Sequence, residues 1–206
     1  MWNRLRAAVL LSATCALTTC QQAATLRIAS PADGAVVYSG RTFVVTVEAS
    51  PGVFKRVSVI GTHSIGSAGP LYAPPYQFTL RVPPNTNSGT YYVTAIGFTA
   101  SDERVESEIK VDVERPDPPV TIKNELSMLL VDVGHRSLLL VTGTFADGST
   151  VDLTYSSLTT YSSSNSAVAK TGPSAFVTAV GPGSAEITIT NNGTSVVVPI
   201  KVAKPR

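Results

Sequence analysis

The stretch Thr142-Gly-Thr-Phe-Ala-Asp-Gly-Ser-Thr-Val-Asp-Leu-Thr154 decides how this chain is expected to fold. At its centre, the dipeptide Asp147-Gly148 separates two short runs of strand-forming residues. Such a dipeptide between extended segments is a strong local signal for a tight hairpin, because glycine adopts a positive φ without steric cost. The stretch therefore predicts two antiparallel strands joined by a short turn.

Two further segments follow the hairpin in a fixed order: Tyr161-Ser-Ser-Ser-Asn-Ser-Ala-Val-Ala169 and Phe176-Val-Thr-Ala-Val-Gly-Pro-Gly-Ser-Ala-Glu-Ile-Thr-Ile189. Together with the hairpin, they resemble the bacterial immunoglobulin-like domain of group 2, the module repeated in intimin- and invasin-type surface proteins. The resemblance covers most of residues 120–203 and implies an immunoglobulin-like β-sandwich. The family usually has Trp just before Ser-Ser, where this chain has Tyr161. A buried tyrosine at that position needs a partner or water for its hydroxyl.

Other strands of this C-terminal segment are predicted from apolar runs and turn signals. Leu129–Val133 and Leu138–Thr142 are apolar enough to form strands with little exposed surface. Near the end of the segment, Asn191-Asn-Gly193 predicts a second tight hairpin.

The composition favours short strands and excludes some classes of partner. The chain has 206 residues, enough for one large or two small domains. Charged residues make up 15% and the formal net charge is +2, so nothing in the charge indicates binding to nucleic acid. The chain has 15 glycines and 14 prolines, and helix-favouring runs are nearly absent, which predicts an all-β protein.

Residues 25–114 are predicted to form a separate sandwich. Thr42–Ala49 alternates between apolar and polar residues, as a half-buried antiparallel strand does, and Gly89–Thr99 is the longest strand-forming run. The motifs Ser30-Pro-Ala-Asp-Gly34, Pro74-Pro-Tyr76 and Gly89-Thr-Tyr-Tyr-Val-Thr-Ala95 give this segment a looser resemblance to bacterial immunoglobulin-like domains.

A proline-rich linker, Arg115-Pro-Asp-Pro-Pro119, separates the two predicted domains. Prolines favour extended backbone, so the linker should act as a short, semi-rigid spacer. The predicted architecture is therefore two tandem immunoglobulin-like β-sandwiches, at 25–114 and 120–203, arranged end to end after an N-terminal signal segment.

The signal segment is predicted at residues 1–20. Arg4 and Arg6 precede the apolar stretch 7–19, which is too short to cross a bilayer and reads as a secretory signal. Leu17-Thr-Thr-Cys20 resembles the lipobox of bacterial lipoproteins, which implies lipidation of Cys20, although Thr19 stands where Gly, Ala or Ser is usual. The alternative is ordinary signal-peptidase cleavage between residues 20 and 24.

Cysteine usage constrains the core of both domains. Both cysteines, Cys15 and Cys20, lie in the signal segment. No disulfide can therefore link the two sheets of either sandwich, and each must be held by apolar packing and strand pairing.

No residue pattern indicates catalysis or a cofactor. The two histidines, His63 and His135, lie in different predicted domains, and no His/Asp/Glu cluster has the spacing of metal ligands. Asp112, Glu114, Asp117 and Asp132 flank the linker and raise the alternatives of interdomain calcium or of solvated charges at strand ends. The favoured expectation is solvated charges, with no cofactor and no metal.

Two tyrosines are the best sequence indication of a binding surface. Tyr72 and Tyr76 flank the proline pair in Leu71-Tyr-Ala-Pro-Pro-Tyr76, where a rigid loop could present both rings to a sugar or a protein. The alternative is that a tyrosine after two prolines begins a strand and packs inside, and packing is favoured.

The sequence leaves two functions open. The first is a non-enzymatic, exported surface or envelope protein whose tandem domains act as a spacer or adhesive module. Its partner would be a protein or glycan on the cell surface, and it would be a lipid-anchored, periplasmic or secreted protein. The second is a carbohydrate-binding or accessory subunit of a secreted enzyme system, which depends on Tyr72 and Tyr76.

Overall fold

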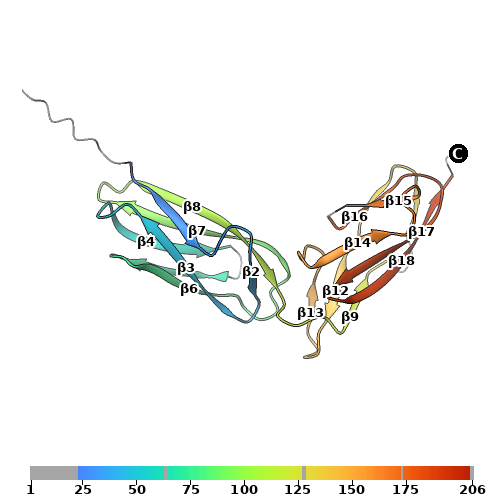
Figure 1. Cartoon of the computed structure of the whole chain (residues 1–206), viewed down its shortest axis with the longest axis horizontal. Coiled ribbons are helices and arrows are strands. Elements are labelled where there is room, and N and C mark those ends of the chain that lie inside the picture. Colours follow the sequence, from blue (N-terminus) through green and yellow to red (C-terminus); the bar gives the residue numbers. More distant parts are fainter. Residues whose placement is uncertain (1–22, 63–64, 127–128, 173, 205–206) are drawn as a thin grey trace, which may run out of the picture.

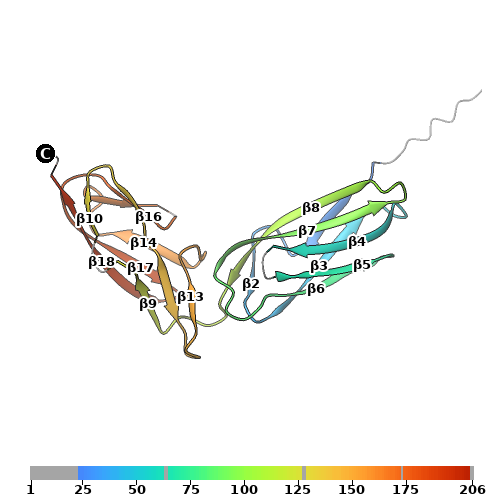
Figure 2. The ribbon, with the colours of Figure 1, turned by 180° about the vertical axis from the view of Figure 1, so that it is seen from behind.

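The chain folds into two β-sandwiches joined end to end (Figure 1). The computed structural model describes residues 23–62, 65–126, 129–172 and 174–204, so the predicted signal segment with Cys15 and Cys20 lies outside the described residues. Strands β1–β8 form the first unit and β9–β18 the second, and each unit has its own cluster of buried apolar side chains. Seen from behind, the chain crosses once between the two units (Figure 2).

The first unit packs a three-stranded sheet, in the order β1-β3-β6, against a five-stranded sheet, in the order β2-β8-β7-β4-β5. All neighbouring strands are antiparallel except β2 and β8, which run parallel. This partition of the strands is that of an immunoglobulin-like sandwich. The strands are β1 (Leu26–Ser30), β2 (Ala35–Tyr38), β3 (Thr42–Ala49), β4 (Phe54–Gly61), β5 (Ser67–Leu71), β6 (Tyr76–Arg81), β7 (Gly89–Thr99) and β8 (Arg104–Glu114).

The alternating residues of the first unit place its core as the sequence predicts. In β3, Val45 and Val47 are buried and Glu48 is exposed, and in β7, Val93 and Ala95 are fully buried. These positions face the opposite sheet, so the sandwich is closed by aliphatic side chains where antibody domains have a disulfide.

A tyrosine near the start of β7 also marks the immunoglobulin-like fold. The hydroxyl of Tyr91 donates a hydrogen bond to the backbone oxygen of Asn87, at 3.0 Å. A tyrosine at this place that bonds back to the chain just upstream is the corner found in many immunoglobulin-like domains. It fixes the loop that leads into β7.

The second unit is also a sandwich, with more and shorter strands. Its sheets have the orders β10-β18-β17-β14, β13-β12-β9 and β11-β16-β15. The strands are β9 (Thr121–Asn124), β10 (Leu129–Asp132), β11 (Arg136–Leu138), β12 (Val141–Thr144), β13 (Thr150–Asp152), β14 (Thr159–Ser163), β15 (Ala169–Thr171), β16 (Phe176–Ala179), β17 (Gly183–Asn191) and β18 (Thr194–Ala203).

Both predicted hairpins of the second unit are present. β12 pairs with β13 around Asp147-Gly148, and Gly148 has a φ of 79°. β17 pairs with β18 around Asn192-Gly193, where both residues have positive φ, at 49° and 89°. Two positive φ values in a two-residue loop are those of a type I′ turn, which matches the right-handed twist of the paired strands.

The predicted strand over Leu138–Thr142 is wrong in its continuity. The chain forms two short strands there, β11 pairing with β16 and β12 pairing with β9 and β13. The break falls at 139–140, where the Leu139 N–H donates to the Ala175 backbone oxygen outside both ladders. Between the two ladders Leu139 is fully buried and Leu140 is exposed, so the continuous apolar run of the sequence does not correspond to one continuous strand.

Tyr161 occupies the position where the resembling family usually has Trp, and its hydroxyl has the partner that burial demands. It donates a hydrogen bond to the Thr154 backbone oxygen at 3.1 Å. Burial, followed by the charge of Asp152 and then Tyr155, raises the pKa of Tyr161 far above the ordinary range. The ring therefore remains a neutral hydrogen-bond donor in the core.

Candidate functional site at the junction of the two units

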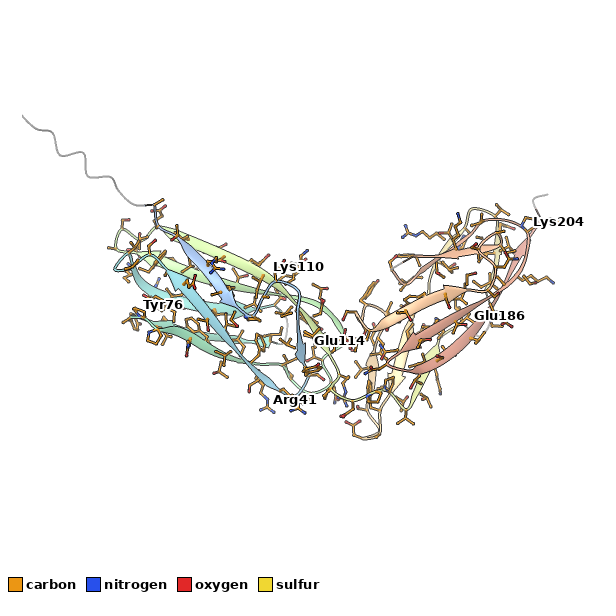
Figure 3. All side chains as sticks on the ribbon, in the orientation of Figure 1. Arg41, Tyr76, Lys110, Glu114, Glu186 and Lys204 are labelled. Atoms are coloured by element: carbon orange, nitrogen blue, oxygen red, sulfur yellow. The ribbon has the colours of Figure 1, made fainter. Side chains whose placement is uncertain are left out.

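The two tyrosines predicted as ligand contacts do not form one surface. Tyr72 follows β5 and is 71% exposed, whereas Tyr76 begins β6, is 7% exposed and belongs to the core of the first unit. Tyr76 lies toward the end of the first unit that is away from the second (Figure 3). The hypothesis of two exposed rings is therefore wrong for Tyr76, and the favoured alternative, a tyrosine that begins a strand and packs inside, is confirmed for it, because alternation along β6 turns its ring inward.

The other candidate residues are dispersed. His135 is exposed in the turn between β10 and β11, and His63 and Cys20 lie outside the described residues. Within the described ranges, no three His, Cys, Asp or Glu side chains are close enough to hold a metal ion. Near the linker, Asp112 accepts a hydrogen bond from Thr90 Oγ1 and stays partly exposed. Glu114, in contrast, is buried and accepts from Ser156 and Ser157, so the prediction of solvated charges is wrong for Glu114.

Glu114, the last residue of β8, forms the centre of the contact between the units. It is 1% exposed although it carries a carboxyl group, and it lies at the end of the first unit that faces the second (Figure 3). Its Oε2 accepts a hydrogen bond from Ser156 Oγ at 2.7 Å, and its Oε1 accepts from the Ser157 N–H at 2.7 Å and from Ser157 Oγ at 2.9 Å. A buried carboxylate is stable only with such donors, so the turn at 156–157 is built to receive it.

Hydrogen bonds within the second unit fix the turn at 156–157. Ser156 Oγ accepts hydrogen bonds from Asn191 Nδ2 and from the Leu158 N–H, both at 3.1 Å. Asn191 is itself buried, and its Nδ2 also donates to Thr159 Oγ1 at 2.8 Å. Because both acceptor positions of Ser156 Oγ are used, its single hydrogen points to Glu114.

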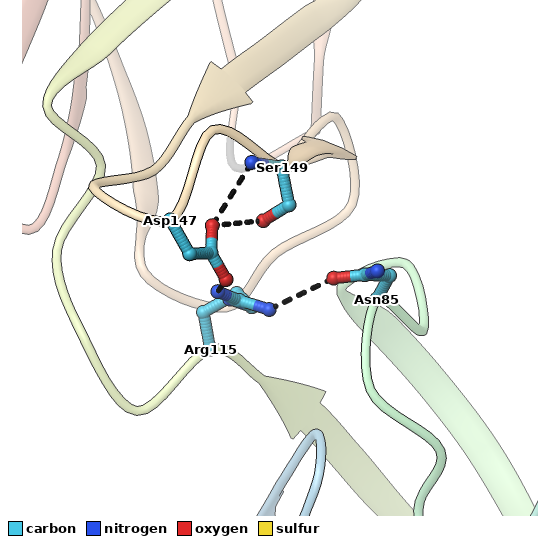
Figure 4. Close-up of polar contacts among 4 residues, drawn as sticks. All are labelled: Asn85, Arg115, Asp147 and Ser149. Carbon is cyan, nitrogen blue, oxygen red and sulfur yellow. Dashed lines mark hydrogen bonds and ion pairs between the residues drawn. The ribbon is translucent and has the colours of Figure 1, made fainter.

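Arg115, directly after Glu114, makes a second contact between the units (Figure 4). Its guanidinium pairs with Asp147 Oδ2 of the second unit at 3.0 Å and donates to Asn85 Oδ1 of the first at 3.2 Å. The guanidinium carbon also lies 4.4 Å from the centre of the Phe145 ring. The side chain of Arg115 is only 11% exposed, so this residue of the predicted linker is packed between the two units.

Asp147 is held in its charged form by two sets of donors. Its Oδ1 accepts from the Ser149 N–H at 2.9 Å and from Ser149 Oγ at 2.5 Å. These bonds, and then the bond to Arg115, lower the pKa of Asp147 to about 2. The turn that joins β12 and β13 thus presents a permanent negative charge to the first unit near neutral pH.

Backbone groups complete the junction. The Ser88 N–H of the first unit donates to the Asp152 backbone oxygen of the second at 3.1 Å, and the Asp152 N–H donates to Asn87 Oδ1 at 3.3 Å. At the other end of the linker, Thr194 Oγ1 donates to the Pro119 backbone oxygen at 2.6 Å. The short connection between the units is therefore fixed at both ends and along one side.

Comparisons with known proteins agree with an immunoglobulin-like fold but identify no family for this chain. No protein-family model and no curated protein sequence matches the chain. Among solved structures, the fibronectin(III)-like modules of Clostridium thermocellum CbhA are similar at 15% identity and a TM-score of 0.38, over 86% of this chain and 94% of that one. Domains 4 and 5 of the S-layer protein SbsC are similar at 18% identity and a TM-score of 0.35, over 61% of this chain and 69% of that one.

A third solved structure is SGBP-B of a mixed-linkage glucan utilization locus of Bacteroides ovatus, in complex with a mixed-linkage heptasaccharide. It is similar at 13% identity and a TM-score of 0.36, over 87% of this chain and 47% of that protein. With TM-scores below 0.5, none of these similarities carries an argument about function. The strand order on its own defines the class: the chain is an all-β protein of two tandem immunoglobulin-like sandwiches. In the parts that the structure describes, no helix is long and apolar enough to cross a membrane.

Proposed function

We propose that this chain is a non-enzymatic, exported surface or envelope protein whose two immunoglobulin-like domains act as a stiffened spacer that presents a binding surface. Under this proposal the second unit is a bacterial immunoglobulin-like domain of group 2, as the Asp147-Gly148 hairpin and the segments 161–169 and 176–189 suggest. The observation that carries the proposal is the burial of Glu114 in the contact between the units.

A spacer needs a fixed relation between its domains, and a short linker alone does not supply one. Contacts between domains of one chain usually permit relative motion unless they are extensive. Here Glu114, Arg115 and the Ser88–Asp152 backbone bond tie the units at three separate places. These three contacts support a role that depends on holding the two domains in one orientation.

Distances between spin labels in solution test the stiffness. In a variant with Cys15 and Cys20 replaced by Ser, labels would be attached at Gln77→Cys in the first unit and Lys201→Cys in the second, both exposed positions. A stiff junction gives one narrow distance distribution. A broad distribution would contradict the spacer proposal.

The proposed export is tested separately by the mass of the protein made in a bacterial host, beside a Cys20→Ala variant. A mature chain that begins at Cys20 and carries acyl groups would support a lipid-anchored envelope protein. An unmodified chain that begins further along would support a periplasmic or secreted one. A chain that keeps residues 1–20 would contradict export.

A second candidate is a carbohydrate-binding accessory protein, and the exposed ring of Tyr72 favours it. Binding to a glycan that is lost in Tyr72→Ala would support this candidate. Hydrolysis of a glycan by the purified protein, lost in His135→Ala, would contradict the non-enzymatic role in both candidates.

A further inference from the structure

A cleft of about 410 Å³ lies beside the contacts that join the units, and both units line it. The first unit contributes the chain that enters β7, with Asn87, Ser88 and Gly89. The second contributes Asp152 at the end of β13 and Tyr155 in the turn that follows. Clefts between two domains are common ligand sites, because they are concave and combine groups from two surfaces.

Several polar groups of the cleft have hydrogen-bonding capacity left. Ser88 is 6% exposed and its hydroxyl is buried without a partner among the described residues. Asn87 uses its Oδ1 to accept from the Asp152 N–H, which leaves its amide NH₂ group as a donor. Asp152 uses Oδ1 to accept from the Thr154 N–H, which leaves Oδ2 as an acceptor.

The cleft also presents an aromatic ring. Tyr155 is 60% exposed, and it lies against Gly89, where an added Cβ would come within 3.5 Å of Tyr155 Cβ. Gly89 has a φ of +147°, a backbone conformation that residues with a side chain rarely adopt. An exposed tyrosine is a rigid contact surface that loses little conformational entropy on binding.

The charge of the lining selects among classes of ligand. Among the described residues that line the cleft, Asp152 is the one charged residue and there is no Lys, Arg or His, so an anion would find no counter-charge there. Burial, and then the charge of Asp152, raises the pKa of Tyr91, which also lines the cleft, so the negative charge acts inside it. A cationic ligand would use Asp152 and the rings but would leave the Asn87 donor without a role.

From this combination we propose that the cleft between the units binds a neutral oligosaccharide. Sugar hydroxyls both donate and accept, so they can satisfy the amide NH₂ group of Asn87 and the carboxylate oxygen of Asp152 at once. The apolar face of a sugar ring packs on Tyr155. The proposal shares with the spacer role the packing of residues 87–91 against 152–155, but it does not need the contacts of Glu114 and Arg115.

The test uses the full chain on a printed array of neutral, acidic and amine-bearing glycans, followed by calorimetric titration with the neutral oligosaccharide that binds best. Tyr155→Ala should weaken binding about tenfold or more, as loss of a central aromatic contact does. Tyr155→Phe keeps the ring and should bind within about threefold of the wild type. Tyr72→Ala is the matched control, because it removes another exposed tyrosine outside the cleft, and it should leave binding unchanged.

Three results would overturn the proposal: no neutral glycan binds, Tyr155→Ala binds as the wild type does, or Tyr72→Ala removes binding. Melting temperatures of all variants separate loss of binding from loss of folding, and Tyr155→Ala should melt as the wild type does because its side chain is mostly exposed. The distance between the spin labels in the Tyr155→Ala variant should also be unchanged. A broad distance distribution in the wild type would count against the spacer role, whereas binding in the cleft is decided by the titrations of the wild type and the variants.

Discussion

Glu114→Gln tests whether the junction depends on a carboxylate with three donors around it. The substitution keeps the size and shape of the side chain and replaces one oxygen by an NH₂ group. If Gln places its oxygen near the two donors of Ser157, its NH₂ group faces Ser156 Oγ, whose acceptor positions are taken by Asn191 and Leu158. If Gln turns over, the NH₂ group meets the two donors of Ser157 instead. The first orientation leaves the buried Ser156 hydroxyl without an acceptor, and the second leaves the Ser157 N–H without one.

The size of the effect follows from the bonds that are lost. A hydrogen bond to a charged group contributes about 1.5–3 kcal/mol, and a buried donor without a partner costs about 1–3 kcal/mol. The variant no longer buries a charge, and this stabilises it and offsets part of the loss. We expect the bonds to dominate, because all three donors are already directed at the carboxylate, with a net loss of about 1–3 kcal/mol.

Differential scanning calorimetry and the spin-label distance measure this loss. A domain of 60–100 residues loses about 4–8 °C in melting temperature for each kcal/mol, so the transition that includes the second unit should move down by several degrees. The distance distribution between labels at Gln77→Cys and Lys201→Cys should broaden. Glu108→Gln is the control, because the same substitution on β8 affects an exposed carboxylate with one bond, from Thr94 Oγ1, and should cost less than about 0.5 kcal/mol.

An unchanged melting temperature with an equally narrow distribution would refute the role of Glu114 in the junction. A higher melting temperature would show that relief of the buried charge outweighs the lost bonds. Either result would remove the main support for the stiffened spacer.

Three further predictions concern single side chains. Arg115→Lys keeps the charge but loses the planar group that bonds Asp147 and Asn85 at once and stacks on Phe145. The distribution of label distances should broaden, and the free energy of unfolding in urea titration should fall by about 1 kcal/mol. Unchanged values would contradict the contact with both units. Tyr161→Phe removes the bond to the Thr154 backbone oxygen and should cost about 0.5–1.5 kcal/mol in the same titration, with exposed Tyr72→Phe as a silent control. The pKa of Asp147 is about 2 in the folded chain against an ordinary 3.8, so its contribution to folding stability is complete above about pH 4 and is lost as the pH falls toward 2. Between pH 5 and pH 2 the melting temperature of the wild type should therefore fall more than that of Asp147→Asn. Parallel melting curves for the two proteins would contradict this.

Local sequence signals predicted the strands and hairpins well. The limits of Thr42–Ala49 and Gly89–Thr99 agree with β3 and β7, and both Gly-containing turns join the strands expected. These features depend on alternation and on glycine, which act over a few residues. The run 138–142 was predicted less well because an apolar run does not show where a chain changes its pairing partner.

The junction could not be predicted from the sequence. Glu114 and Ser157 are 43 positions apart, and a lone glutamate at a strand end normally reads as solvated. Arg115 was predicted only as the first residue of a semi-rigid spacer. Its contacts could not be predicted, because they lie on turns whose relative position depends on the whole fold. The one sequence signal nearby was Asp147-Gly148, which predicted the turn but not what the turn would bind.

In each unit the last strand pairs in parallel with the second strand of the unit, and this has a mechanical consequence. In the first unit β2 runs parallel to β8, with Ala35 beside Val111 and Tyr38 beside Glu114, and in the second unit β10 runs parallel to β18. Tension that draws the start of β2 away from the end of β8 slides one strand along the other, so the four residue pairs of this ladder share the load. The pairs of such a ladder must break together, and the same holds for β10 and β18, so in each unit the last strand resists sliding along its parallel neighbour.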